Sequence, residues 1–330
     1  MRKIHSLITG GAGFIGSHLC EKLVSLNHKV TIIDNFDVGK KSNIHHLSKL
    51  IDIKYLDIRN YNKIEKIFKN VDNVFHLAGL ADIVPSIENP TDYFNTNVTG
   101  TLNVVNAAIK NKVTKFIYTA SSSCYGIPKK YPTSENEEIK PEYPYALTKR
   151  LGEEIVMHFG KIYDLNVTSL RFFNVYGLRA RTSGTYGAVF GVFLAQKLKN
   201  LPLTVVGDGK QKRDFTYVTD IVDAIVAVLD NKKSKNKIFN VGSGKTVSIN
   251  KIIKLMKVDK TINIPKRPGE PSQTFADISK IKKIIGWKPK IDIEKGITFM
   301  LQNINDWKSA PLWTPKKIKK ATKSWFKYLA

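Results

Sequence analysis

Acidic side chains and arginines are scarce in this sequence. Its 330 residues carry 28 Asp and Glu against 53 Lys and Arg, and the formal net charge is +25. Only eight of the basic residues are arginines, and the lysines are spread over most of the predicted helices and loops. Nucleic-acid sites usually combine clustered Arg and Lys with interleaved aromatic residues. The charge therefore indicates a lysine-rich enzyme surface and no nucleic-acid partner, with a nucleic-acid-binding protein as the alternative.

Cysteine and long apolar runs are scarce as well. The two cysteines, Cys20 and Cys124, have no metal-ligand spacing and cannot form a disulfide framework, which indicates a reducing compartment and no metal site. No apolar run approaches the length that spans a membrane, and the first predicted strand begins too early to leave room for a signal peptide. We expect a cytoplasmic protein with no stable membrane insertion.

Glycines follow the first predicted strand at once. Residues 4–9 read as a buried strand, and Gly10, Gly13 and Gly16 come before an apolar helix at residues 17–26. This spacing permits a tight turn and the close approach of a pyrophosphate to bare backbone at a helix N-terminus. The next strand ends in Asp34, whose carboxylate can accept hydrogen bonds from ribose hydroxyls and would repel a 2′-phosphate. The pattern favours NAD over NADP; the alternative for Asp34 is a turn or cap residue.

Strands and helices then alternate as far as residue 178. Such alternation predicts an α/β fold with a Rossmann-like, doubly wound parallel sheet, in which ligands lie beyond the carboxyl ends of the strands. The predicted strands are residues 29–33, 52–56, 71–77, 115–120 and 167–172, and the predicted helices include residues 62–69, 90–112 and 145–163.

A tyrosine and a lysine four residues apart, Tyr145 and Lys149, share one face of a predicted helix. The ammonium can favour the ionised phenol, so the tyrosine can act as a base near neutral pH. The Ser121 hydroxyl, at the end of the preceding strand, can bind the same substrate oxygen. Alone the pattern is weak, because a surface tyrosine beside a solvated lysine fits it too.

Regular alternation loosens after residue 178. We predict a cofactor domain at residues 1–178, to which segments near 213–245 return, and a smaller α/β substrate domain at 179–330. Arg213 and Arg267 lie in predicted loops of this second part and could clamp a diphosphate, or be solvated or structural arginines. Apolar residues of the tail, among them Ile318 and Trp325, have helical spacing; we expect the tail to dock onto the protein rather than lie on a membrane.

The motifs in this order resemble the extended short-chain dehydrogenase/reductase family and, within it, the nucleotide-sugar epimerases and dehydratases. The resemblance implies bound NAD, a nucleoside-diphosphate-sugar substrate, and a homodimer built from helices near residues 90–112 and 145–163. It is carried by residues 9–16, 34–36, 57, 76–79, 97–101, 121–126, 145–149, 171–177, 213–215 and 240–242.

The subgroup most similar to this sequence is the UDP-sugar 4-epimerases, which act on UDP-glucose, UDP-N-acetylglucosamine or UDP-glucuronate and often serve polysaccharide biosynthesis. The resemblance implies that Ser121, Tyr145 and Lys149 are catalytic. The cofactor residues that it implies are Gly10, Gly13, Phe14, Ile15, Gly16, Asp34, Asn35, Asp57, Ile58, Leu77, Ala78, Gly79, Asn97, Tyr145, Lys149 and Phe172. The substrate residues are Ser121, Ser122, Ser123, Tyr145, Asn174, Ala188, Val189, Thr204, Val206, Arg213 and Arg267.

The implied reaction is inversion at C4 through a 4-keto sugar, with Tyr145 as the base. The related 4,6-dehydratases place Asp and Glu directly after the equivalent of Ser121, and UDP-glucuronate decarboxylases typically keep a Glu there. Ser122 and Ser123 stand at these positions, which disfavours dehydration and, less strongly, decarboxylation. Ala81 stands near the place of a cofactor-holding lysine in glucose-type epimerases. The alternative is an epimerase, decarboxylase or 4,6-dehydratase that acts on another nucleotide sugar.

Overall fold

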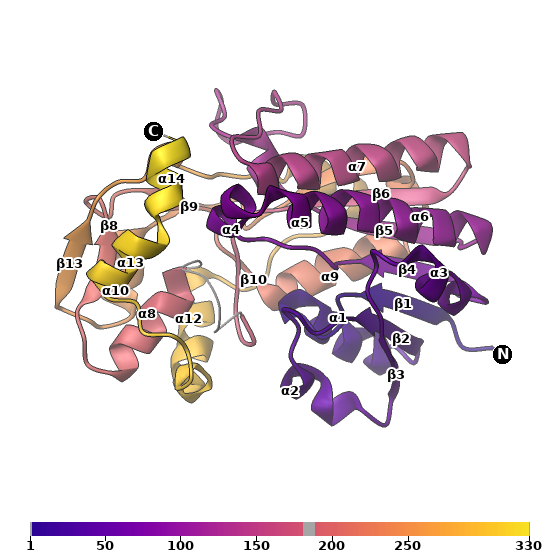
Figure 1. Ribbon diagram of the computed structural model, residues 1–330, viewed down its shortest axis with the longest axis horizontal. Helices are drawn as coiled ribbons and strands as arrows, with labels where there is room; N and C mark the ends of the chain where they lie inside the picture. The colour runs from indigo at the N-terminus through magenta and orange to yellow at the C-terminus, as the bar shows by residue number, and fades with distance from the viewer. Residues whose placement is uncertain (1, 181–188, 330) are drawn as a thin grey trace.

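A seven-stranded parallel sheet forms the centre of the computed structural model, which describes residues 2–180 and 189–329. The strand order is β11-β6-β5-β4-β1-β2-β3 (Figure 1). The predicted α/β class and parallel sheet are confirmed. The strands are β1 (His5–Thr9), β2 (Lys29–Asp34), β3 (Ile51–Tyr55), β4 (Asn73–His76), β5 (Lys115–Ser121), β6 (Asn166–Phe172) and β11 (Lys237–Val241).

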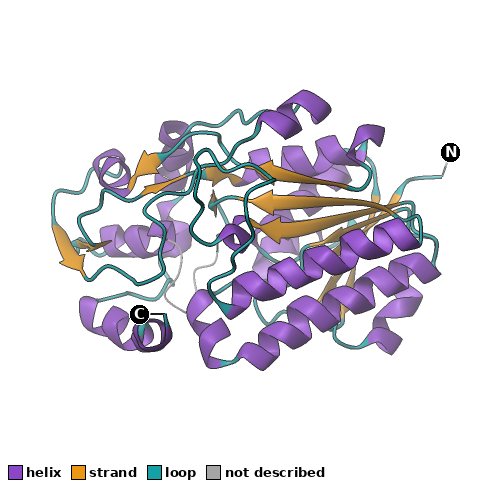
Figure 2. Cartoon of the chain, turned by 90° about the horizontal axis from the view of Figure 1, so that it is seen from above, coloured by secondary structure: helices purple, strands orange, loops and turns teal. Residues whose placement is uncertain are grey.

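Successive residues of the central strands belong to two different cores. In β1, Leu7 joins one buried cluster and Ile8 the other, and in β5 Phe116 and Ile117 divide in the same way. This follows from the strand period of two. The cluster of Ile8 and Ile117 contains residues of α1 (Phe14–Ser25), α9 (Val218–Leu229) and α11 (Ser279–Ile285). The cluster of Leu7 and Phe116 contains residues of α3 (Tyr61–Ile64), α6 (Gly100–Lys110) and α7 (Pro144–Ile162). Helices therefore cover both faces, as seen from above in Figure 2.

The helix predicted over residues 90–112 is interrupted. It consists of α5 (Pro90–Phe94), a π-helical turn (Asn95–Thr99) and α6. Such turns are often found at functional sites. The turn carries Asn97, whose side-chain amide binds the backbone of Leu80 and the hydroxyl of Thr148. The interruption thus ties the segment after β4 to α7.

The C-terminal part has small sheets and a core of its own. Figure 2 shows the arrowheads of the central strands pointing toward this part. Its buried cluster includes Phe193, Leu203, Ile252 and Trp307. Its elements are β8 (Leu203–Val206) with β13 (Thr261–Ile264), β9 (Lys212–Arg213) with β12 (Val247–Ser248), β7 (Val175–Tyr176) with β10 (Thr216–Tyr217), and the helices α8 (Val189–Leu198), α10 (Ile249–Leu255), α12 (Ile293–Gln302), α13 (Pro315–Ala321) and α14 (Lys323–Tyr328).

The tail folds back onto the protein, as predicted. Ile318 and Trp325 are buried, and α14 lies beside α4 (Ile83–Glu88) (Figure 1). Among the helices of residues 2–180 and 189–329, none combines the length and the apolar character needed to cross a membrane.

A buried ion pair attaches α7 to the sheet. Glu153 is 1% exposed and Arg171 of β6 is 2% exposed, and Arg171 Nη2 lies 2.6 Å from Glu153 Oε1. Ser169 Oγ donates to Glu153 Oε2 at 2.8 Å. Burial acts to raise the pKa of Glu153, but hydrogen bonding to Arg171 and its charge outweigh burial, and the pKa is lowered. Both groups are therefore charged in the folded protein.

Replacing Glu153 by Gln leaves the Arg171 guanidinium buried without its carboxylate. We expect Glu153→Gln to lower the free energy of unfolding by about 3–5 kcal/mol, measured by urea denaturation. The control is Glu154→Gln on the same helix, because Glu154 pairs with Arg150 at the surface and its loss costs about 0.5 kcal/mol or less. Equal midpoints for the two variants would contradict the role given to this pair.

Candidate functional site

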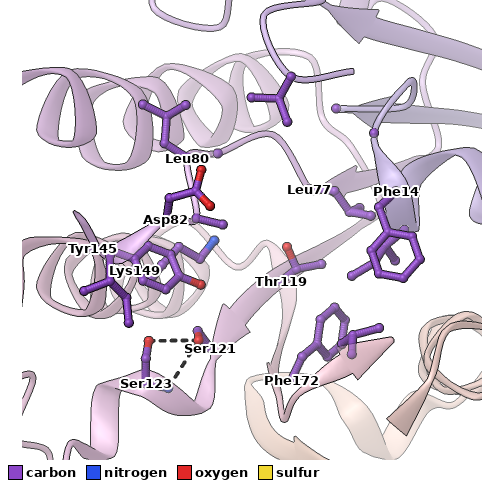
Figure 3. A pocket seen from close by; sticks show the side chains of 18 of the residues that line it. Phe14, Leu77, Leu80, Asp82, Thr119, Ser121, Ser123, Tyr145, Lys149 and Phe172 are labelled. Carbon is purple, nitrogen blue, oxygen red and sulfur yellow. Dashed lines mark hydrogen bonds between the residues drawn. The ribbon is translucent and has the colours of Figure 1, made fainter. Parts of the chain in front are cut away.

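The candidate site is a cleft of about 870 Å³ at the carboxyl edge of the sheet. The strand order reverses between β1 and β4, and the loops after these two strands lie side by side there. The cleft continues between the sheet and the C-terminal part, because residues of both parts line it. Figure 3 shows Phe14 and Leu77 on one side, and Ser121, Tyr145 and Lys149 on the other.

In the glycine turn after β1, neither Gly10 nor Gly16 leaves room for a side chain. Gly10 has φ +73°, and a Cβ there would lie 2.7 Å from the backbone nitrogen of Ala78. A Cβ on Gly16 would lie 2.1 Å from the carbonyl oxygen of Gly10. The first turn of α1 contains no acidic residue. A bare turn at a helix N-terminus is therefore open to a pyrophosphate, as the sequence predicts.

Asp34 lies at the end of β2 beside this turn. Its carboxylate accepts hydrogen bonds from the backbone N–H groups of Ala12 at 2.9 Å and Phe36 at 2.8 Å. Burial raises the pKa of Asp34, although these two hydrogen bonds act to lower it. The carboxylate both holds the glycine turn and lines the cleft, where it can accept ribose hydroxyls.

Asp57 follows β3 at the same end of the cleft. Asn35 Nδ2 donates to its carboxylate at 3.0 Å, and the guanidinium of Arg59 binds it at 2.6 Å. Hydrogen bonding to Arg59 is the main cause that lowers the pKa of Asp57, so the group is an anion at neutral pH. These contacts hold Asp57 in place in the wall of the cleft.

Of the predicted cofactor residues, all but one line the cleft. The exception is Asn97, which is buried behind the wall with its amide bound to Leu80 and Thr148. Asn97 holds the segment after β4, including Gly79, against α7, and its contact with the cofactor stays a prediction. The glycine cradle and Asp34 fit an NAD molecule.

His76 is a buried polar residue for which the sequence predicts no separate role. Its Nδ1 lies 2.6 Å from Thr9 Oγ1 and its Nε2 2.9 Å from Thr101 Oγ1. Burial, with a contribution from the charge of Lys149, lowers the pKa of His76 to about 3. The imidazole is therefore neutral, and it links the ends of β1 and β4 to α6.

The three predicted catalytic residues meet in the cleft (Figure 3). Ser121 is the last residue of β5, and its Oγ accepts hydrogen bonds from Ser123 N–H at 3.2 Å and Ser123 Oγ at 2.8 Å. Tyr145 and Lys149 lie one turn apart at the start of α7. Lys149 Nζ lies 4.5 Å from the centre of the Tyr118 ring. The arrangement places a phenol, an ammonium and a hydroxyl around one volume.

Burial governs the titration of this group. It raises the pKa of Tyr145; hydrogen bonding to Ser121 and Ser123 lowers it, and the charge of Asp82 raises it. Burial also lowers the pKa of Lys149 to about 8, against the opposing effect of Glu153. The expectation of a lowered Tyr145 pKa is therefore wrong for this structure, because the loss of solvent outweighs the groups that favour the phenolate.

Two arginines line the end of the cleft that the C-terminal part forms. Arg213 Nη2 donates to Glu270 Oε1 at 2.7 Å, and Arg267 Nη1 lies 3.8 Å from Glu270 Oε2. Asn174 also lines the cleft, and its Oδ1 accepts a hydrogen bond from Thr274 at 2.7 Å. The predicted diphosphate residues are thus brought together from three distant segments.

Other predicted substrate residues lie elsewhere. Thr204 is buried in β8 with its hydroxyl bonded to Gln196, Val206 ends the same strand, and Val189 packs against the C-terminal core; none of the three lines the cleft. Thr204 and Val206 belong to the separate small sheet of β8 and β13, and the substrate role of all three residues stays a prediction. Ala188 lies outside the described residues.

The cleft is also lined by residues that the sequence does not predict there, among them four of the C-terminal segment: Ala310, Pro311, Trp313 and Trp325. The apolar spacing of the tail predicts that it docks, but not where. Nothing in the local pattern indicates that the docked tail contacts the cleft.

The chain matches the NAD dependent epimerase/dehydratase family over residues 6–242. It is 38% identical to a putative UDP-glucose 4-epimerase of Methanocaldococcus jannaschii, over 88% of this chain and 95% of the relative. It is 35% identical to UDP-N-acetyl-alpha-D-glucosaminuronate decarboxylase of Bacillus cytotoxicus, over 91% of this chain and 97% of the relative.

A similar solved structure is UDP-glucuronic acid 4-epimerase of Bacillus cereus, in complex with UDP-glucuronic acid and NAD. Its TM-score is 0.85 at 33% identity, and the match covers 92% of this chain and 99% of that one. With a glycine turn that fits NAD and a Ser-Tyr-Lys group beside it, the chain belongs to the NAD dependent epimerase/dehydratase family, among the NAD-dependent epimerases and decarboxylases of UDP-sugars.

Proposed function

We propose that this protein is a UDP-sugar 4-epimerase that inverts C4 of a UDP-hexose through a 4-keto intermediate. The observation that carries the proposal is the segment after β5, where Ser121, Ser122 and Ser123 line the cleft beside Tyr145. Elimination of water from the sugar needs an acid and a base of its own, and the two positions directly after Ser121 supply hydroxyls instead. Proton transfer at O4 by Tyr145 needs nothing more.

The roles of the chain's own residues follow from their places. NAD, when bound, supplies the acceptor and donor for the hydride of C4. Tyr145 takes the proton of O4 and later returns it, while the Ser121 hydroxyl holds the same oxygen. Arg213, Arg267 and Asn174 hold the diphosphate, so the sugar can turn over while the nucleotide stays fixed. Lys149, which lines the cleft, would hold the nicotinamide ribose.

Decarboxylation of a UDP-uronate is the second candidate. The relative from Bacillus cytotoxicus is named as a decarboxylase and is nearly as similar as the epimerase relative. Oxidation at C4 makes a uronate a β-keto acid, which loses carbon dioxide readily, so the same Ser-Tyr-Lys group can start both reactions. The two candidates differ in their products.

Proton NMR of the protein with UDP-glucose, UDP-N-acetylglucosamine and UDP-glucuronate separates these candidates. We expect new anomeric signals of the matching C4 epimer from at least one of them. A 4-keto-6-deoxy product, or a UDP-pentose from UDP-glucuronate, would contradict the epimerase. Tyr145→Phe should lower the rate by about 10²–10⁴-fold or more, because it removes the proton acceptor. Tyr143→Phe is the control, since Tyr143 stacks beside Tyr145.

The acid limb of the pH profile of kcat/KM should follow the pKa of Tyr145, because the phenolate is the active form of the base. The charge of Asp82 raises this pKa, so Asp82→Asn should move the limb to lower pH. Hydrogen bonding to Ser123 lowers it, so Ser123→Ala should move the limb to higher pH. Shifts in one common direction would rule out Tyr145 as the group observed.

A homodimer is part of the proposal. The helices α5 and α6 pack beside α7, and Phe94 of α5 and Leu147 of α7 are exposed (37% and 38%). Analytical ultracentrifugation should show a dimer, and the double variant Phe94→Glu/Leu147→Glu should shift it toward the monomer. A monomeric wild type at micromolar concentration would contradict this assembly.

A cytoplasmic location is also proposed, supported by two buried free cysteines.

A further inference from the structure

The tail of the chain lines the cleft at its arginine end. We propose that residues 311–329 form part of the nucleoside-diphosphate site, in which Trp325 is a positioning residue for Arg267. This inference rests on the proposed function in taking a nucleoside diphosphate as the ligand. It adds a segment that the sequence analysis assigned only to docking.

Trp325 contacts both the side chain of Arg267 and the backbone next to it. The guanidinium carbon of Arg267 lies 5.2 Å from the centre of the indole ring, within range of a cation–π interaction. The indole Nε1 donates a hydrogen bond to the carbonyl oxygen of Pro268 at 2.7 Å. Trp325 is 6% exposed, so these contacts are largely shielded from water. One side chain therefore fixes the arginine and the loop that bears it.

Glu270 completes the arrangement. Its carboxylate binds Arg213 at 2.7 Å through one oxygen and lies 3.8 Å from Arg267 through the other. Two guanidinium groups thus share one carboxylate at the cleft wall. A diphosphate needs two nearby cationic forks at fixed positions, because each fork binds phosphate oxygens in a defined geometry. Holding them in place before binding reduces the entropy lost on binding.

The tail is anchored on both sides of the cleft. Ser324 Oγ donates to Glu88 of α4 at 2.6 Å, and α4 begins directly after Asp82 in the cleft wall. On the other side, Gln196 Nε2 of α8 donates to the carbonyl oxygen of Trp313 at 2.8 Å. Figure 1 shows the resulting position of α14, in yellow, between α4 and the C-terminal part. The tail therefore bridges the two walls that a nucleotide sugar must contact.

The test is the affinity for UDP, measured by calorimetry without turnover. Trp325→Leu removes the ring and the hydrogen bond and should weaken UDP binding about tenfold or more. Trp325→Phe keeps an aromatic face and should retain part of the affinity. Phe326→Leu is the matched control, because Phe326 is the next residue of α14 and is 38% exposed; its affinity should stay within about twofold of the wild type.

A double-mutant cycle separates positioning from a general structural effect. If Trp325 acts through Arg267, Trp325→Leu should change UDP affinity little in a protein that already carries Arg267→Ala. In turnover assays Trp325→Leu should raise KM far more than it lowers kcat, because Trp325 contacts Arg267 and Pro268 at the arginine end of the cleft. If Trp325→Leu fails to fold, Trp325→Phe with and without Arg267→Ala gives the same cycle.

Wild-type affinity for UDP in both Trp325 variants would overturn the proposal, and so would fully additive losses in the cycle. The outcome is distinct from that of the proposed function. Trp325-dependent binding of UDP without inversion of C4 would refute the epimerase and leave the role of the tail intact. Inversion of C4 with Trp325-independent binding would do the reverse. A wild type that does not bind UDP would contradict both.

Discussion

The reversal of strand order between β1 and β4 is the constraint on which the site depends. Loops that leave neighbouring parallel strands in opposite directions leave a crevice between them. Here the backbone around Gly10 and Ala78 closes one end of that crevice so tightly that no Cβ fits at Gly10. The neutral His76 ties the same two strands to α6 through threonine hydroxyls. The cofactor end of the cleft is therefore built directly on the sheet.

The catalytic end depends on how α7 is held against the sheet. Glu153 pairs with Arg171 of β6 two turns after Tyr145, and Asn97 binds Thr148 between Tyr145 and Lys149. Both contacts are buried, and both come from elements that also border the cleft. Burial that fixes the helix also removes water from Tyr145 and Lys149, so it raises the pKa of the phenol and lowers that of the ammonium. The burial that holds α7 in place is therefore also what shifts Tyr145 and Lys149 toward their uncharged forms.

Local sequence predicts the sheet and the cofactor end because their signals are local. A strand, a glycine turn and a helix lie within about twenty residues, and most of the predicted cofactor residues line the cleft. The sequence says less where the position of a residue depends on pairing with a distant segment. Thr204 is predicted as a substrate residue, but it lies in β8, which pairs with β13 far along the chain, and does not line the cleft. The sequence predicts Asn97 within a continuous helix. The π-helical turn that directs its side chain to Leu80 and Thr148 is not visible in the local sequence pattern. From the sequence, Trp325 is predicted only to dock. The loop that it contacts lies 57 positions earlier, so the local pattern does not indicate this contact.

The few arginines of the chain share one kind of environment. Each arginine of residues 2–180 and 189–329 pairs with a carboxylate, whereas the net charge of +25 comes from lysines. A guanidinium tolerates burial in an ion pair better than an ammonium, because its planar fork satisfies several donors at once. Arg171 uses this property to hold α7. Arg213 and Arg267 share Glu270 at the cleft. The cationic groups relevant to a diphosphate are thus these two arginines, which Glu270 holds at the cleft wall, and the larger lysine charge is a property of the surface.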